Sequence, residues 1–135
     1  MKQSFILLFA TVAFASCNQS SSVAESGNTP SKTLVVEQNY FDKTISNNKL
    51  TLVDFYTTWC GPCKKMAPFI EKIKTDRVGD VTVLSVDAEN ETNISSRYSI
   101  EGYPTIIFFK NGVIVHRELG YRNLEELTAL VEKFK

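Results

Sequence analysis

The chain has 135 residues, of which 43% are apolar, enough for one globular domain and little more. Its 15 basic side chains balance 15 acidic ones, so no net charge is available to hold a polyanion, and nucleic-acid binding is not expected. Three cysteines are too few for a disulfide-stapled scaffold. With the single histidine they provide no ordinary zinc site unless Cys17 takes part.

Residues 1–16 have the composition of an export signal. One cation, Lys2, precedes an apolar stretch over residues 5–15, and small residues close the segment. A membrane-spanning helix needs about 20 apolar residues, and this stretch has 11. We therefore expect a signal peptide that is absent from the mature fold.

Two cleavage sites are compatible with this signal. Ala13-Phe14-Ala15 suits the ordinary signal peptidase and would release a soluble exported protein that starts near Ser16. Phe14-Ala15-Ser16-Cys17 resembles a bacterial lipoprotein box, although Phe14 stands where Leu is most common. A free Cys17 thiol would be prone to unwanted pairing in an oxidising compartment. We therefore favour lipidation of Cys17 and a periplasmic protein held at the membrane by the lipid anchor alone.

Residues 17–32 are predicted to be the lipidated cysteine and a flexible linker. The segment is rich in Ser, Asn and Gly and has almost nothing to bury. A flexible chain of this length has a root-mean-square reach of roughly 20 Å. Such a reach would lift a small domain clear of a bilayer.

From residue 33 onward, strand-like and helix-like patterns alternate, which predicts one α/β domain over residues 33–135. Asn111-Gly112 predicts the turn of a hairpin, and Asn123 is a good first cap for the last helix. The expected strands are residues 34–36, 50–56, 81–86, 105–109 and 113–117. The expected helices are residues 40–46, 63–74, 91–98 and 123–134.

The segment Trp59-Cys60-Gly61-Pro62-Cys63 lies where a buried strand ends and a helix begins. Two cysteines across the first turn of a helix can close a small disulfide ring, and the helix dipole there favours a thiolate on Cys60. Pro62 fits because a first-turn position has no helical partner for its missing N–H, and Gly61 leaves the Cys60 sulfur open. Cys63 lies deeper in the helix. We expect it to be the more buried cysteine and to act after a mixed disulfide has formed.

This segment and three later ones closely resemble the thioredoxin family. The matching segments are residues 52–64 (LVDFYTTWCGPCK), 66–68 (MAP), 102–105 (GYPT) and 109–112 (FKNG). A lone CxxC pair would be a weak sign, but the four segments in this order are very specific. The resemblance covers about residue 33 to the C-terminus. It implies a thioredoxin fold, α/β with a central mixed sheet and helices on both faces, and a cis Pro104 beside the two sulfurs.

The resemblance also implies roles for three residues. Cys60 would attack a substrate disulfide, Cys63 would resolve the mixed disulfide, and Asp54 would move the proton of Cys63. Asp54 lies inside an apolar strand, where a carboxylate is costly unless its pKa shifts or it finds partners. A satisfied structural acid is the alternative role for Asp54.

Substrate contact, by the same resemblance, would come from a shallow patch near the cysteines. Backbone groups beside Pro104 would pair with an extended substrate segment, a form of strand addition. For Trp59, Leu119 and Tyr121, ordinary packing is the alternative, and His116 is expected to be an ordinary surface side chain without a catalytic role. The expected substrate-contacting residues are Trp59, Gly61, Pro62, Tyr103, Pro104, Leu119, Gly120 and Tyr121.

Four positions depart from the common bacterial pattern of the family. Tyr103 replaces Ile or Val before the proline, Tyr121 stands where a small residue is common, and Tyr56 stands where Trp is frequent. Tyr103 and Tyr121 would enlarge and polarise the patch, which puts the substrate preference in doubt. Val83 is predicted to occupy the place of a Lys near the buried acid, which would leave the pKa of Asp54 higher.

The sequence therefore predicts a protein-disulfide reductase in the periplasm. Its partners would be disulfide-containing exported proteins and a membrane thiol relay or reductase that supplies electrons. Gly61-Pro62 is the dipeptide of reducing thioredoxins and favours reduction over oxidation. We expect a monomer that uses no cofactor and no metal. The alternative is a non-catalytic module of the same fold that binds peptides or scaffolds a partner.

Overall fold

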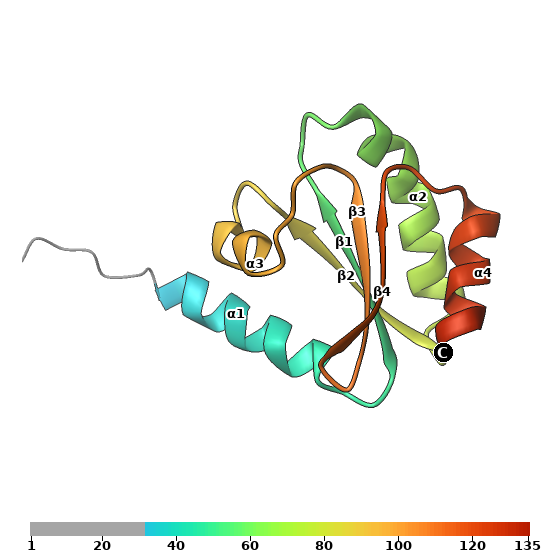
Figure 1. Ribbon diagram of the computed structural model, residues 1–135, viewed down its shortest axis with the longest axis horizontal. Coiled ribbons are helices and arrows are strands. Elements are labelled where there is room, and N and C mark those ends of the chain that lie inside the picture. Colours follow the sequence, from blue (N-terminus) through green and yellow to red (C-terminus); the bar gives the residue numbers. More distant parts are fainter. Residues whose placement is uncertain (1–31) are drawn as a thin grey trace, which may run out of the picture.

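A computed structural model describes residues 32–135 of the chain, with side chains from Gln38 onward. The predicted signal peptide, most of the predicted linker and Cys17 lie outside the described residues. The elements, in chain order, are α1 (Lys32–Ile45), β1 (Leu50–Tyr56), α2 (Gly61–Asp76), β2 (Val81–Asp87), α3 (Thr92–Arg97), β3 (Thr105–Lys110), β4 (Val113–Leu119) and α4 (Leu124–Phe134) (Figure 1).

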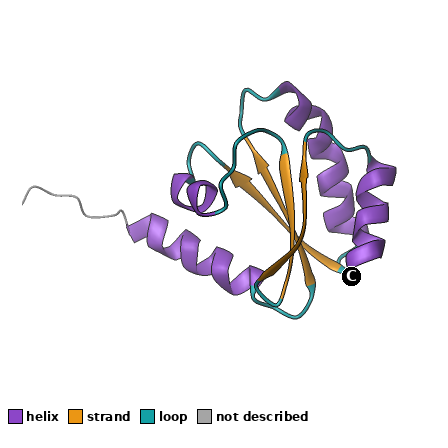
Figure 2. Ribbon diagram, in the orientation of Figure 1, coloured by secondary structure: helices purple, strands orange, loops and turns teal. Residues whose placement is uncertain are grey.

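The four strands form one mixed sheet in the order β2-β1-β3-β4 (Figure 2). β1 pairs in parallel with β2 and antiparallel with β3, and β3 and β4 form an antiparallel hairpin. Helices α2 and α4 cover one face of the sheet, while α1 and α3 lie on the other (Figure 1). This arrangement confirms the predicted fold class, a central mixed sheet with helices on both faces.

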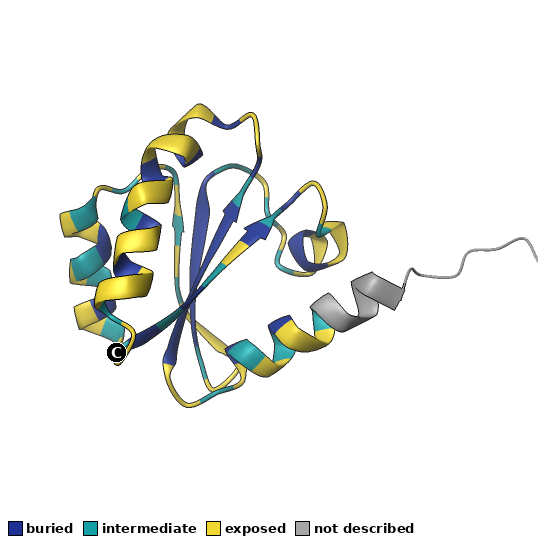
Figure 3. Ribbon diagram, turned by 180° about the vertical axis from the view of Figure 1, so that it is seen from behind, coloured by how far each residue is buried: buried dark blue, intermediate teal, exposed yellow. Residues whose placement is uncertain are grey.

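Alternation along the two central strands divides the core into two layers. Leu52 on β1 and Phe108 on β3 pack under α2 and α4, whereas their neighbours Val53 and Phe109 pack toward α1 and α3. The central strands are accordingly buried on both faces (Figure 3). Because side chains alternate along a strand, Asp54 shares the face of Leu52 and lies under α2.

The predicted strand at residues 34–36 is wrong, because α1 runs without interruption from Lys32 to Ile45. A run of three apolar residues cannot distinguish a strand from a helix by periodicity. It adjoins the helical pattern of residues 40–46, and a helix that has formed extends at little cost. The outer edge of β2 consequently has no strand beside it within residues 32–135.

The predicted helix at residues 40–46 is the second half of α1, which begins eight residues earlier, and the remaining predicted elements are confirmed to within about two residues at each end. Asn111 and Gly112 have φ angles of 53° and 78°, as the tight turn of a right-twisted hairpin requires. Asn123 caps α4: its side chain accepts the N–H of Glu126 at 3.0 Å, and the Glu126 carboxylate accepts the N–H of Asn123 at 2.8 Å. The turn and the helix cap each depend on a few adjacent residues, so the sequence predicts both.

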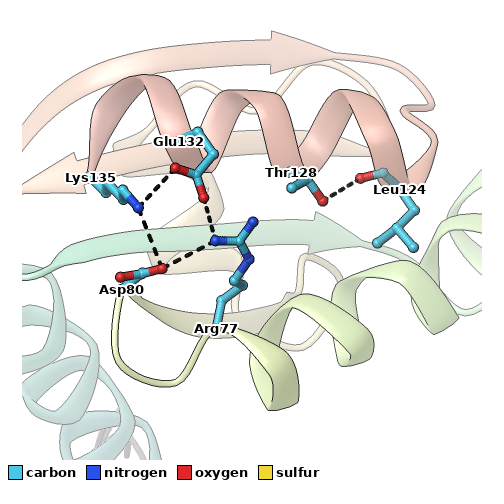
Figure 4. A network of polar contacts seen from close by, with 6 residues as sticks. All are labelled: Arg77, Asp80, Leu124, Thr128, Glu132 and Lys135. Carbon is cyan, nitrogen blue, oxygen red and sulfur yellow. Dashed lines mark hydrogen bonds and ion pairs between the residues drawn. The ribbon is translucent and has the colours of Figure 1, made fainter.

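An ion-pair network joins the C-terminal ends of α2 and α4 (Figure 4). Arg77 forms ion pairs with Glu132 on α4 and with Asp80, the latter at 3.2 Å. Lys135 pairs with Glu132 at 2.8 Å and with Asp80 at 3.7 Å. The network holds the two helices together at the end of the sheet far from the cysteines. No helix within residues 32–135 is long and apolar enough to cross a membrane.

Candidate active site

Cys60 and Cys63 form a disulfide at the start of α2, directly after β1. The S–S distance is 2.03 Å and the two Cα atoms are 5.3 Å apart. Cys60 has extended backbone angles and is the N-cap of α2, and its Sγ accepts the N–H of Cys63 at 3.1 Å. Pro62 occupies the first turn of the helix, where its missing N–H is harmless. β1 ends at Tyr56, four residues before the N-cap Cys60, and the short connection places both sulfurs over the positive end of α2.

The two cysteines are buried to the same degree in this disulfide form. Cys60 is 4% exposed and Cys63 is 5% exposed, so the prediction that Cys63 is the more buried one was wrong. The reason is the S–S bond, which draws the Cys60 sulfur from the N-cap position over the first turn of α2. Helix position alone does not determine the burial of a cross-linked side chain.

Asp54 is a buried acid on the face of β1 that α2 covers. It is 5% exposed, and burial raises its pKa to about 7. Its Oδ1 atom has no hydrogen-bond partner among the described residues. Asp54 and Cys63 line the same cavity, whose volume is about 540 Å³. A carboxyl group with this pKa can accept and release a proton near neutral pH.

The prediction that Val83 stands beside the buried acid was wrong. In the parallel pairing of β1 with β2, Asp54 is opposite Ser85, and Val83 is opposite Leu52. Val83 is part of the core under α2 and α4, whereas Ser85 is exposed and lines the cavity of Asp54. A single sequence does not determine the register of two strands distant in the chain, which is why the position was assigned two residues too early.

The loop before β3 contributes a second part of the site. The Tyr103–Pro104 peptide bond is cis, as the family resemblance implied, and Pro104 is buried. The Pro104 carbonyl accepts the N–H of Gly120 at 2.8 Å, which ties the end of β4 to this loop. Gly120 has a φ of 95°, a left-handed conformation that glycine adopts without strain.

Trp59 is the most prominent exposed side chain beside the sulfurs. It is 65% exposed and packs edge-on against the Tyr103 ring, with 5.9 Å between ring centroids. Its indole N–H donates to the Glu89 carboxylate at 2.9 Å. Glu89 was not predicted, because it lies in the turn after β2, thirty residues away, and nothing in the spacing connects it with Trp59.

The predicted substrate-contacting residues gather at one end of the molecule, where β1 and β4 end and α2 and β3 begin (Figure 1). Leu119 and Tyr121 are exposed there, and Tyr121 borders a shallow hollow with Pro62 and Lys65. Gly61 is exposed in the segment Cys60-Gly61-Pro62-Cys63, which we call the redox turn. We call the side chains of Trp59, Tyr103, Leu119 and Tyr121 the aromatic rim; Tyr103 is half-buried and the other three are exposed.

His116 lies outside this site, on the face of the sheet covered by α4. It is partly buried rather than an ordinary surface residue, because its ring stacks on Phe134 with 4.7 Å between centroids. Its Nε2 atom and the Glu118 carboxylate are 2.7 Å apart. Within residues 32–135, no group of three or more His, Cys, Asp or Glu side chains is placed to hold a metal ion.

A redox disulfide at a helix N-terminus, a buried acid and a cis-proline loop define a thiol–disulfide oxidoreductase site. The thioredoxin family profile matches residues 32–133, and the chain belongs to the thioredoxin family. It is similar to the thioredoxin of Mycoplasmoides gallisepticum, with 40% identity over 91 residues that cover 67% of this chain and 90% of that protein. The thioredoxin of Mycobacterium bovis is 38% identical over 101 residues, which cover 72% of this chain and 87% of that protein.

The solved structure of Plasmodium falciparum thioredoxin is similar as well. Its TM-score is 0.66 at 37% sequence identity, and the match covers 73% of this chain and 94% of that one. With this family membership and the Cys60–Cys63 pair, the chain is a protein-disulfide oxidoreductase.

Proposed function

We propose that this chain is an exported, lipid-anchored thioredoxin that reduces the disulfides of exported proteins in the periplasm. The observation that carries the proposal is the Cys60–Cys63 pair at the N-terminus of α2, with Asp54 buried beneath it. The export signal and Cys17 support the location. We expect the protein to work as a monomer, with a membrane thiol relay or reductase as its electron donor.

The first chemical step is an attack by the Cys60 thiolate on one sulfur of the substrate disulfide. The substrate S–S bond breaks, a mixed disulfide forms, and the other substrate sulfur leaves as a thiolate that takes a proton from solvent. The N–H groups at the start of α2, including that of Cys63, which Cys60 Sγ accepts at 3.1 Å, favour the Cys60 thiolate.

The second step releases the reduced substrate. Cys63 gives its proton to Asp54 and attacks the Cys60 sulfur, so that the Cys60–Cys63 bond forms and the bond to the substrate breaks. Two electrons have then passed from the dithiol to the substrate disulfide. The shared cavity and the pKa of about 7 suit Asp54 to this proton transfer near neutral pH.

The aromatic rim and the loop around Pro104 are proposed to hold the substrate. An extended substrate segment would pair with the backbone beside Pro104, so that shape counts for more than sequence. Tyr103 and Tyr121 add large polar rings to this surface, and Gly61 and Pro62 leave the approach to the sulfurs free. The hydrogen bond from the Trp59 indole to the Glu89 carboxylate fixes the orientation of the Trp59 ring.

The direction of electron flow is tested by the redox potential of the Cys60–Cys63 pair against glutathione. We expect a value near that of thioredoxin itself, about −270 mV, because the turn holds the same Gly-Pro dipeptide. The strong bacterial oxidant lies near −120 mV, and the difference corresponds to roughly 7 kcal/mol. A value above about −180 mV would contradict the assignment as a reductase.

A non-catalytic peptide-binding module is the second candidate, favoured by the exposed aromatic rim. The rate of insulin reduction by dithiothreitol, measured with and without the protein, distinguishes a reductase from a binding module. We expect catalysis by the wild type and none by Cys60→Ser, because that variant lacks the attacking thiolate. Equal turnover by wild type and Cys60→Ser would favour the binding module. Asp54→Asn should flatten the pH dependence of turnover near neutral pH.

A further inference from the structure

Two side-chain polar atoms are buried without a hydrogen-bond partner among the described residues, and both lie next to the redox pair. They are Asp54 Oδ1 and Thr57 Oγ1. Thr57 is 1% exposed. Buried hydroxyl and carboxyl groups in proteins nearly always have a partner, because an unpaired one costs free energy. Two such atoms at one place point to a polar partner that they share.

The cavity of about 540 Å³ has room for that partner. Asp54, Thr57 and Cys63 all line it. A water molecule needs only about 10–15 Å³ and two to four polar neighbours, so the cavity can hold several waters. A threonine hydroxyl can donate one hydrogen bond and accept two, which suits it to hold a water between two other groups.

Few other charged groups face Asp54. The ionisable side chains that line the cavity besides Asp54 and Cys63 are Tyr56 on β1 and Lys64 and Glu71 on α2. From β2 the cavity receives the uncharged Ser85, and β3 places the apolar Ile106 opposite Asp54. Thr57 is therefore the only buried hydroxyl along the cavity lining within residues 32–135.

The backbone fixes Thr57 relative to the sulfurs. Thr57 follows β1 directly, and its carbonyl accepts the N–H of Cys60 at 3.3 Å. Thr57, which lines the cavity, is thus tied through its backbone to the residue that begins α2. Asp54 lies three residues earlier, within β1, where its pairing with β2 and β3 fixes it.

We propose that Thr57 is a positioning residue for the proton transfer: its hydroxyl holds the water that connects Asp54 Oδ1 with Cys63 Sγ. This inference rests on the proposed function. The Cys63 thiol passes its proton through the water to the Asp54 carboxylate. The Cys63 thiolate then forms the bond to Cys60, and the substrate leaves as a thiolate that is protonated by solvent. Thr57 itself neither gains nor loses a proton overall.

The test compares Thr57→Val, which removes the hydroxyl and keeps the shape, with Thr57→Ser, which keeps the hydroxyl. The titration of the Asp54 carboxyl is followed by ¹³C NMR in the oxidised protein. We expect Thr57→Val to raise the midpoint by about half to one pH unit, because a lost hydrogen bond disfavours the charged form. At neutral pH the resolving step in single turnover should slow about two- to fivefold, since less Asp54 is ionised. Thr57→Ser should match the wild type in the midpoint of the Asp54 titration and in the rate of the resolving step.

Thr58→Val is the matched control, because Thr58 is the next residue, lines the same cavity and is exposed. Wild-type behaviour of Thr57→Val, or an equal shift in Thr58→Val, would overturn the assignment to Thr57. Should the valine variant not fold, Thr57→Ala removes the same hydroxyl.

Asp54→Asn identifies the carboxyl resonance and separates this inference from the function on which it rests. If Asp54→Asn abolishes the pH dependence of the resolving step while Thr57→Val matches the wild type, only the role of Thr57 fails. If Asp54→Asn leaves that pH dependence unchanged, the proton-transfer role of Asp54 fails and the role of Thr57 with it.

Discussion

Because of Asp54, the folded protein becomes less stable as the pH rises from about 4 to about 7. Its folded-state pKa of about 7 lies above the ordinary value of 3.8, because burial opposes the charge. Between these two pH values the unfolded chain has lost the proton and the folded chain still holds it, so stability falls as pH rises. The difference of about three pKa units lowers the free energy of unfolding by about 4 kcal/mol at pH values above 7.

We therefore expect Asp54→Asn to raise the free energy of unfolding of the oxidised protein by up to about 4 kcal/mol near pH 8. Near pH 3 the gain should vanish, because the acid is then neutral in both states. Urea unfolding at a series of pH values measures this difference. The same gain at both ends of the series would mean that packing, and not ionisation, separates the two proteins.

At the scale of the residue, the sequence reveals groups whose chemistry is marked by their immediate neighbours. Cys60, Cys63 and Asp54 stand in a motif, so their place in one site could be predicted. Ser85 and Glu89 reach the site only through strand register and a turn, and no local pattern marks them. Thr57 lies inside the motif, but the burial of its hydroxyl without a hydrogen-bond partner in the part of the chain that the structure describes is a property of the fold.

At the scale of the element, helix α4 depends on a reciprocal cap at its first turn, in which Asn123 and Glu126 satisfy each other's backbone N–H. We expect Asn123→Ala to lower the free energy of unfolding by about 1 kcal/mol, because the N–H of Glu126 loses its acceptor. Asn123→Ser, which supplies another capping oxygen, should remain close to the wild type. Urea unfolding of the oxidised proteins decides, and an equal loss in both variants would show that the cap oxygen is not the cause.

Elements with a local signal were predicted, and those that depend on distant partners were not. The Asn111-Gly112 turn and the cap of α4 are determined by a few adjacent residues. Residues 34–36 have no such signal: as a strand they would need an edge to pair with, and as a helix they need only the turn that follows. The structure has them in α1. Local cooperativity outweighed the β propensity of two valines.

At the scale of the whole molecule, the fold could be predicted because four motif segments occur in one order, and three of them lie where the chain enters or leaves the sheet. The redox turn follows β1, the cis-proline loop precedes β3, and Asn111-Gly112 joins β3 to β4. Such segments determine where the chain turns, and the apolar alternation between them determines which side of each strand is buried. The helices then cover both faces.

The location of the molecule is the remaining prediction at this scale, and Cys17 decides it. If cleavage precedes Cys17, the wild type should incorporate a palmitate analogue in bacterial cells and sediment with membranes, because the lipid is its anchor. Cys17→Ser should lose the label. The double variant Cys60→Ser, Cys63→Ser should keep it, since Cys17 is then the only cysteine left. A wild type that stays unlabelled and is found in the soluble periplasmic fraction would instead support cleavage after Ala15.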